Sequence, residues 1–238
     1  MSYELEIRES VQADASAIES LYPQAFPDED LLPLVRDLLQ HSAIAVSLVG
    51  AIDSRIAGHA IVTMCGVVGS SFKAALLGPL AVAPAWQRQG IGSAIVRAGL
   101  QRLKDADVDL VCVLGDPAYY GRLGFAPETL VEPPLPLPAE WQGAWQSQYL
   151  GEKSASCSGR LAVPRQWQDP ALWKAEVKML LNELAPDLVL INGQFYDPGT
   201  AGDRPVATGM AVKNGRILAL GADHTMSRMA GDQTKRID

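Results

Sequence analysis

The residues best suited to chemistry lie in one glycine-containing turn in the first half of the chain. An apolar run ends at Val82, and Gln-Arg-Gln-Gly-Ile-Gly-Ser follows over residues 87–93, where an amphipathic stretch begins. Successive backbone N–H groups in a turn that opens a helix form a positively polarised surface, to which the helix dipole adds. Glycines let a bulky anion approach the main chain, and Arg88 adds a positive charge. The turn therefore predicts binding of a cofactor that carries a diphosphate.

Two other interpretations of this turn stay open on the residues alone. Gly90 and Gly92 could simply make a tight turn before a helix, because Gly-x-Gly alone is weak evidence. A Rossmann dinucleotide site would need the turn to follow a first strand, with a third glycine and a downstream acidic residue. Several strand-like runs precede the turn here, which disfavours that arrangement.

The elements that must position the turn follow from the spacing of apolar residues. Two helices followed by three meander strands indicate a central, mixed but mostly antiparallel sheet flanked by helices, an α/β (α+β) fold. Pro23 and Pro27 are expected to break the first helix, and Asp53-Ser54 and Asn214-Gly215 to form hairpin turns. The patterns predict strands at residues 4–8, 44–52, 56–68, 74–82 and 108–114, and helices from about 14 and at 31–40, 90–104 and 117–123.

Two motifs give the turn a more specific meaning. Gln87, Gly90 and Gly92, with the Val-x-Pro before them, resemble the acetyl-CoA loop of the GNAT superfamily of N-acetyltransferases. Further along, Gly-Asp-Pro-Ala-Tyr-Tyr-Gly-Arg-Leu-Gly-Phe at 115–125 resembles the aromatic-Tyr-x-x-x-Gly-Phe segment of that family. The resemblance covers roughly residues 3–173 and is closest to a bacterial subgroup of predicted acetyltransferases.

The resemblance implies the GNAT fold and transfer of an acetyl group from acetyl-CoA to an amine. The strand that ends at Val82 would splay from the strand at 108–114, and the pantetheine arm would lie between them. A main-chain N–H there would polarise the thioester carbonyl. The cofactor-binding residues that the resemblance implies are Leu80, Ala81, Val82, Gln87, Arg88, Gln89, Gly90, Ile91, Gly92 and Ser93.

Tyr120 matches the family position that protonates the departing CoA thiolate, so it is the candidate catalytic residue. Its other interpretation is a ring packed near the cofactor, and Tyr119 is expected to pack against the cofactor or the sheet. The base that takes the proton of the amine is open among three candidates. Asp116 could equally cap a helix, His59 could be a packed core histidine, and the acidic run 28–30 could be a solvated loop.

The chain from Pro186 onward has a different pattern of short strands. The segment 186–238 resembles the start of the N-terminal β-domain of metal-dependent amidohydrolases, but it stops before the His-x-His metal pair of that family. We therefore expect an acetyltransferase domain at 1–173, a helical linker at 174–185 and a non-catalytic β appendage at 186–238. Open strand edges in the appendage would favour association, so a homodimer is one option.

Composition narrows the class of protein. The net charge of −7 argues against a nucleic-acid-binding chain, and no apolar run is long enough for a membrane span. Three separated cysteines and three histidines give no metal motif, so we expect no metal; Cys65 and Cys112, both in strand runs, are expected to be buried and inert. A cytoplasmic location follows as an expectation. The alternative to an acetyltransferase is a non-catalytic module that binds or senses acyl-CoA.

Overall fold

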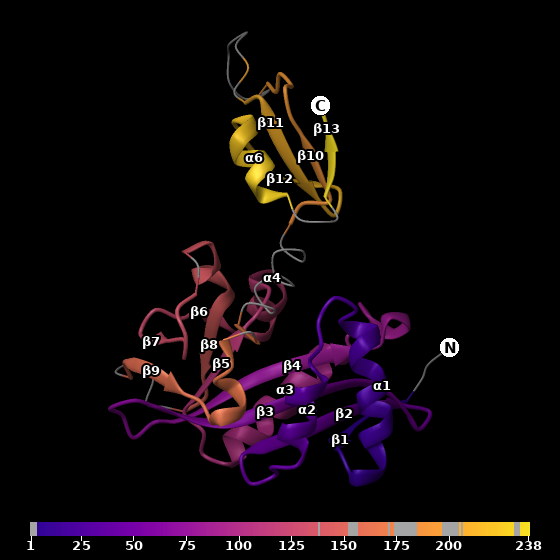
Figure 1. Ribbon diagram of the computed structural model, residues 1–238, viewed down its shortest axis with the longest axis vertical. Coiled ribbons are helices and arrows are strands. Elements are labelled where there is room, and N and C mark those ends of the chain that lie inside the picture. The colour runs from indigo at the N-terminus through magenta and orange to yellow at the C-terminus, as the bar shows by residue number, and fades with distance from the viewer. Residues whose placement is uncertain are drawn as a thin grey trace. The chain divides into compact units, whose positions relative to one another are not determined.

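In the computed structural model the chain divides into two units, Met1–Glu176 and Val177–Asp238 (Figure 1). The described residues are 4–137, 139–151, 157–170, 172–173, 185–196, 205, 207–230 and 234–238.

The first unit is built on a large twisted sheet whose order is β1-β2-β3-β4-β5-β8-β6, with β9 beside both β3 and β7. Neighbours are antiparallel except for the pairs β4–β5 and β7–β9. The expected mixed, mostly antiparallel sheet is therefore confirmed. The strands are β1 (Leu5–Glu9), β2 (Ala45–Ile52), β3 (Arg55–Val67), β4 (Lys73–Val82), β5 (Leu110–Leu114), β6 (Ala126–Pro127), β7 (Val131–Glu132), β8 (Trp145–Tyr149) and β9 (Gly159–Ala162).

The meander β2-β3-β4 places β4 at the centre of the sheet. The predicted Asp53-Ser54 turn joins β2 to β3, and both residues have positive φ, at 47° and 64°. This conformation suits the right-handed twist of a tight hairpin. On the other side of β4 lies β5, whose five residues are all buried, as its unbroken apolar sequence predicts.

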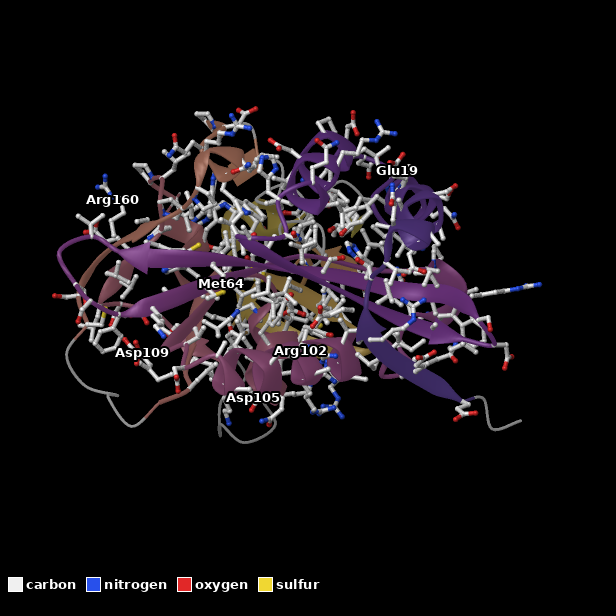
Figure 2. All side chains as sticks on the ribbon, turned by 90° about the horizontal axis from the view of Figure 1, so that it is seen from below. Glu19, Met64, Arg102, Asp105, Asp109 and Arg160 are labelled. Carbon is white, nitrogen blue, oxygen red and sulfur yellow. The ribbon has the colours of Figure 1, made fainter. Side chains whose placement is uncertain are left out.

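Helices cover both faces of this sheet (Figure 2), with Glu19 of the first helix and Arg102 of the third on opposite sides. Ile91 and Ile95 of the third helix pack against Leu48 and Ala60 of the sheet. The helices of this unit are α1 (Ala15–Ala25), α2 (Leu32–Leu39), α3 (Ile91–Asp105) and α4 (Pro117–Tyr120), the last continued by a 3-10 turn at Gly121–Leu123.

The expectation that Pro23 breaks the first helix is wrong, because α1 continues through Pro23 to Ala25. Pro23 is exposed, so the hydrogen bond that it cannot donate is lost on the solvent side, near the end of the helix. The buried side of α1 carries Ile18, Leu21 and Tyr22, which face the sheet.

The sequence beyond residue 132 shows a group of large aromatic residues but no clear strands, and the structure resolves it into β8 and β9. The indole nitrogen of Trp167 donates to the Thr63 hydroxyl at 3.0 Å, and the ring of Trp173 packs against Trp167 and Trp145 at centroid distances of 6.1 and 6.4 Å. These contacts hold the segment against the sheet. Most of the linker helix expected at 174–185 lies outside the described residues.

The second unit has a four-stranded sheet of order β12-β11-β10-β13, and the predicted Asn214-Gly215 turn joins β11 to β12. The unit also contains a short helix, α6, which the sequence pattern does not predict. Its Met226 is buried against Val189 and Ala211, so the helix supplies one side of a small core. The elements are β10 (Leu188–Leu190), β11 (Gly209–Lys213), β12 (Arg216–Gly221), α6 (Asp223–Met229) and β13 (Lys235–Ile237).

Candidate functional site

In the first unit, β4 and β5 pair along only part of their length. Their parallel ladder runs from Ala74 opposite Leu110 to Leu76 opposite Cys112, and it ends there. Beyond this point β4 stays paired with β3, and β5 stays paired with β8. The facing edges of the two strands therefore have no strand partner among the described residues, which agrees with the expected divergence of these strands.

The register of β3 and β4 decides which main-chain groups of β4 face this open edge. Ala83 N–H donates to the carbonyl of Ala57 at 2.9 Å, which makes these two residues a hydrogen-bonded pair of the antiparallel ladder. Hydrogen-bonded and non-hydrogen-bonded pairs alternate along such a ladder. Ala81 and His59, two residues further, are therefore also a hydrogen-bonded pair.

Leu80 and Val82 occupy the intervening positions, so their N–H and C=O groups point away from β3 toward the open edge. The side-chain amide of Gln87 donates to the Val82 carbonyl at 3.1 Å from that side. Of the three residues expected to pair with the pantetheine arm, Leu80 and Val82 can offer main-chain groups. The main-chain groups of Ala81 pair with His59 of β3 instead, and its place in the expected cofactor site stays a prediction.

The glycine-containing turn connects β4 to the start of α3. Gly90 is the N-cap residue, with a φ of +85°, and Arg88 before it also has a positive φ of 59°. No described side chain caps this helix. The first N–H groups of a helix have no acceptor within the helix, so they remain available to an anion at this end.

The polar side chains of the turn lie on the surface, and one of them holds the backbone of the turn in place. Gln87, Arg88 and Gln89 are exposed, and the Gln89 amide donates to the Ala85 carbonyl at 2.9 Å. Ile91 is 1% exposed and packs in the core, so only its main chain can meet a ligand. The residues expected to hold a diphosphate are thus brought together at the start of α3, where Ile91 offers only its backbone.

Tyr119 joins the turn to the open edge of β4. A Cβ atom on Gly92 would lie 2.7 Å from the Tyr119 hydroxyl oxygen, with side-chain atoms of Val82 and Leu80 at 3.4 and 3.6 Å. The guanidinium of Arg122 stacks over the Tyr119 ring at 5.7 Å from its centroid. The sequence indicates only a packing residue at this position, whereas the structure places its hydroxyl over the first turn of α3.

Tyr120 is buried, with 8% of its surface exposed. Its ring lies against the backbone of Gly115, where a Cβ atom would overlap the ring, and it packs edge-on against Tyr119 and Phe125. The carbonyl of Gly115 accepts a hydrogen bond of 2.9 Å from the buried amide of Gln146. Gln146, which the sequence does not single out, thus fixes the loop on which Tyr120 packs.

Asp116, a candidate base, has a structural role. Its carboxylate accepts a 2.8 Å hydrogen bond from Ala118 N–H at the start of α4, so the capping interpretation is confirmed. In the acidic run 28–30, Asp28 and Asp30 are exposed, and Asp30 accepts from Leu32 N–H at the start of α2. Asp116 and Asp30 thus each accept a backbone N–H near the start of a helix, and Glu29 between the two exposed aspartates is half-buried.

His59 is fully buried in β3 between two hydroxyl groups. Its Nδ1 lies 2.8 Å from the hydroxyl oxygen of Tyr22, and its Nε2 lies 2.8 Å from that of Ser47. Burial lowers the pKa of His59 to about 3, against a small opposing effect of the Asp14 carboxylate. The ring is therefore neutral near pH 7 and shielded from solvent, which makes it a hydrogen-bonded core histidine rather than an exposed base.

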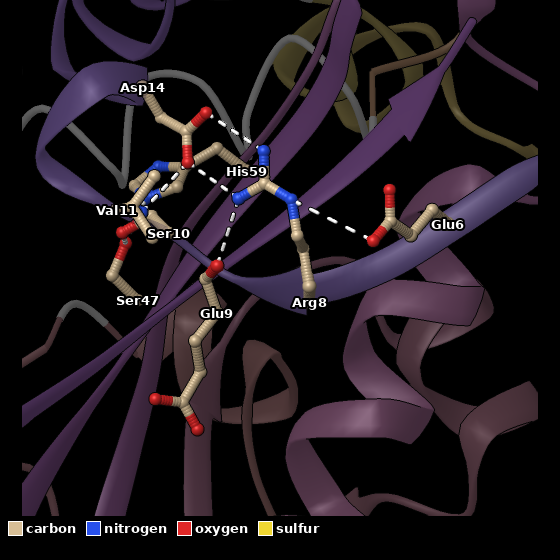
Figure 3. Close-up of polar contacts among 8 residues, drawn as sticks. All are labelled: Glu6, Arg8, Glu9, Ser10, Val11, Asp14, Ser47 and His59. Carbon is tan, nitrogen blue, oxygen red and sulfur yellow. Dashed lines mark hydrogen bonds and ion pairs between the residues drawn. The ribbon is translucent and has the colours of Figure 1, made fainter. Parts of the chain in front are cut away.

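An ion pair stands beside this histidine (Figure 3). Both terminal nitrogens of Arg8 donate to the Asp14 carboxylate, at 2.6 and 2.9 Å, and Val11 N–H donates to it at 2.8 Å. The hydrogen bonds from Arg8 lower the pKa of Asp14. This pair ties β1 to the start of α1, the helix that carries Tyr22.

The cysteines divide between two environments. Cys112 is buried in β5, and burial raises its pKa well above the ordinary value. Cys65 is half-buried rather than buried, which corrects the expectation, although desolvation still raises its pKa to about 12.

In the described part of the chain, no three His, Cys, Asp or Glu side chains come together as a metal ion would need, and no helix is long and apolar enough to span a membrane.

Glu128 is a buried carboxylate that the sequence does not single out. It accepts hydrogen bonds from the backbone of Leu130 and Val131, at 2.6 and 3.0 Å, and from the Ser147 hydroxyl at 2.5 Å. These donors fix the turn before β7 and tie it to β8. A single glutamate after a proline carries no signal of this role in the sequence.

Comparison with solved structures identifies two that combine this fold with a bound cofactor. The GNAT family N-acetyltransferase YhbS from Escherichia coli, in complex with CoA, aligns with a TM-score of 0.63 and 25% identity over 70% of this chain and 93% of its own. A GNAT family acetyltransferase from Brucella melitensis, in complex with acetyl-CoA, aligns with a TM-score of 0.56 and 27% identity over 70% and 99%.

Sequence comparison agrees. The uncharacterized N-acetyltransferase YjhQ of E. coli K12 is 31% identical over 157 residues, which cover 63% of this chain and 87% of the relative. The family model described as the acetyltransferase (GNAT) family matches residues 15–125, which include the turn, α3 and both tyrosines of α4. The chain therefore belongs to the GNAT family of acetyltransferases.

Proposed function

We propose that the protein transfers the acetyl group of acetyl-CoA to a primary amine. The observation that carries the proposal is the meeting, at Gly92, of the uncapped start of α3 with the open edge of β4. The helix start is suited to a diphosphate, and the strand edge is suited to an extended amide chain. Acetyl-CoA carries both groups, joined in that order.

In this proposal the main-chain groups of Leu80 and Val82 pair with the pantetheine arm. The amine nitrogen attacks the thioester carbonyl carbon, and the bond between that carbon and sulfur breaks. The leaving thiolate takes a proton from Tyr120, and the nitrogen loses its own proton to solvent or to a nearby base. Tyr120 regains a proton from solvent before the next turnover. Holding the two reactants together supplies much of the acceleration.

The second candidate is a non-catalytic module that binds acyl-CoA, and the burial of Tyr120 favours it. A phenol that is 8% exposed and packed edge-on between two aromatic rings serves well as a core residue. The two candidates agree on cofactor binding and differ only on turnover. A binding assay followed by a turnover assay therefore separates them.

The test begins with thermal unfolding of the full chain in the presence of CoA or acetyl-CoA. We expect both to raise the unfolding temperature, and no stabilisation by either would remove the cofactor assignment. Acetyl-CoA consumption is then followed by mass spectrometry against polyamines, amino sugars, amino acids, and peptides with free N-termini or lysines. Binding without turnover across this panel would favour the sensing module.

For the second unit we propose a non-catalytic appendage, on the basis of its resemblance to the start of an amidohydrolase β-domain. The proposed boundaries are 1–173 for the acetyltransferase domain, 174–185 for a helical linker and 186–238 for the appendage. We also propose that the reaction takes place in the cytoplasm. Amide hydrolysis by the full chain after addition of zinc or manganese would overturn the non-catalytic assignment.

A further inference from the structure

A line of hydrogen bonds runs through the first unit from β1 to β4. Ser10 and Ser47 are half-buried, whereas His59 and Tyr22 are 0% and 1% exposed. Figure 3 shows Ser10, Ser47 and His59 side by side. The successive contacts are Ser10 Oγ to Ser47 Oγ at 2.6 Å, Ser47 Oγ to His59 Nε2 at 2.8 Å, His59 Nδ1 to the Tyr22 hydroxyl at 2.8 Å, and the Tyr22 hydroxyl to the Pro79 carbonyl at 3.5 Å.

All of these hydrogen bonds can form together in only one orientation. A phenol has one proton, so Tyr22 can donate to the Pro79 carbonyl only while it accepts from His59 Nδ1–H. The neutral His59 ring then accepts at Nε2 from the Ser47 hydroxyl, which itself accepts from Ser10. Because burial keeps His59 neutral near pH 7, the line retains this direction. It ends on a main-chain carbonyl of β4.

Pro79 stands where β4 changes its register with β3, between the pairs Leu77–Val62 and Leu80–Ala60. A proline has no N–H group, so Leu80 supplies the first main-chain donor after this irregularity. The Pro79 carbonyl and the Leu80 N–H belong to the same planar, trans peptide group and point in opposite directions. A hydrogen bond that holds the carbonyl therefore also sets the direction of the N–H, which faces the open edge of β4.

We propose that Tyr22, held by His59, Ser47 and Ser10, is a positioning residue that aims the Leu80 N–H at the thioester carbonyl of bound acetyl-CoA. The inference rests on the proposed function. A donor that is fixed before the reaction stabilises the developing negative charge without paying for its own reorientation. Tyr22 touches neither substrate and acts only through the Pro79–Leu80 peptide.

The test uses Tyr22→Phe, which removes the hydroxyl and keeps the ring stacked on Phe26 at 5.8 Å. Acetyl-CoA labelled with carbon-13 at the thioester carbonyl is bound to the full chain, and its carbonyl stretch is measured by infrared difference spectroscopy. We expect the band to lie below that of free acetyl-CoA in the wild type and to move back toward the free value in the variant. Affinity for CoA should stay within about twofold, because the glycine turn is untouched.

Tyr149→Phe is the matched control, since Tyr149 also makes a 3.5 Å hydrogen bond to a buried acceptor, Glu128. Tyr149 lies in β8, with β5 between it and β4, and its register position corresponds to Ala74 rather than Leu80 of β4. This control should leave the band unchanged. With an amine acceptor from the panel, Tyr22→Phe should lower kcat about tenfold and change the KM for acetyl-CoA little, as expected for loss of a contact that is weak to the bound thioester and much stronger in the transition state.

An unchanged band in a folded, acetyl-CoA-binding Tyr22→Phe protein would overturn the inference. The inference would also be overturned if wild-type protein binds acetyl-CoA but its carbonyl band lies at the position of free acetyl-CoA. In that case the binding would leave the proposed function standing. Failure of the wild type to bind acetyl-CoA would remove both. If Tyr22→Phe does not fold, Ser47→Ala interrupts the same line at a half-buried residue, and it must shift the band in the same direction.

Discussion

The hydroxyl oxygen of Tyr119 lies 2.7 Å from the position that a Cβ atom would take on Gly92. A Cβ atom would fit there only if the Tyr119 side chain shifted, so the contact as it stands requires glycine at the first turn of α3. It also links two segments that are separate in the sequence, the turn after β4 and the helix after β5. The glycine at which we propose that a diphosphate approaches the backbone thus also seats a tyrosine beside it.

A first prediction concerns this contact. Gly92→Ala should push the Tyr119 ring away from the turn and weaken CoA binding about tenfold, because small displacements of a binding group are costly. Isothermal titration with CoA measures the loss. Tyr119→Phe removes the obstructing oxygen, so the double variant should bind CoA more tightly than Gly92→Ala alone. Equal losses in the single and double variants would show that the hydroxyl contact is irrelevant.

The turn itself is tested by charge. Gly90→Asp places a carboxylate at the uncapped start of α3 and should abolish the rise in unfolding temperature caused by CoA, because it repels the diphosphate. Gly69→Asp is a matched control. Gly69 also has a positive φ, 78° against 85°, and open space at its Cβ, but it lies in the hairpin between β3 and β4. A CoA-induced shift that survives in Gly90→Asp would contradict the assignment.

Substitutions at the two adjacent tyrosines are expected to change different kinetic constants. Tyr120→Phe preserves the packed ring and should lower kcat about a hundredfold, if its hydroxyl protonates the departing thiolate. Tyr119→Phe should act mainly on the KM for acetyl-CoA, because that hydroxyl lies over the turn. Stopped-flow or mass-based rates with the amine found by screening measure both. A Tyr120→Phe enzyme with the wild-type kcat would leave the residue a purely structural role.

Burial of His59 predicts an unusual loss of stability in mild acid. Its pKa falls from 6.5 to about 3 on folding, so between these values the unfolded chain binds a proton that the folded protein does not. Above pH 6.5 His59 is neutral in both the folded and the unfolded chain and does not reduce the free energy of unfolding. Below that pH the free energy of unfolding should decline by up to about 1.4 kcal/mol per pH unit.

Urea unfolding at several pH values, followed by tryptophan fluorescence, measures this slope. All five tryptophans lie in the first unit, so the signal reports on that unit. His59→Gln should flatten the slope between about pH 4.5 and 6.5, whereas the half-buried His41→Gln should not. An unchanged slope in His59→Gln would assign the acid sensitivity to another group.

The family and the outline of the fold could be predicted from the sequence because they depend on local patterns. Alternating apolar residues predict β2, β3 and β4, and the glycines of the turn predict the start of α3 whatever lies around them. The same holds for Asn214-Gly215, whose turn conformation is a property of the residues themselves. The strands β8 and β9 could not be placed, because their aromatic residues find partners only across the sheet.

The roles of individual site residues were decided by tertiary structure. The sequence shows His59 only as a histidine in a strand, and its neutral state follows from burial between Tyr22 and Ser47, which come from α1 and β2. In the same way, the register with β3 points the main-chain groups of Ala81 toward β3 and those of Leu80 and Val82 toward the open edge. Local sequence determines which elements form, but burial, register and close approach depend on residues far away along the chain, and these set the protonation and direction of each group.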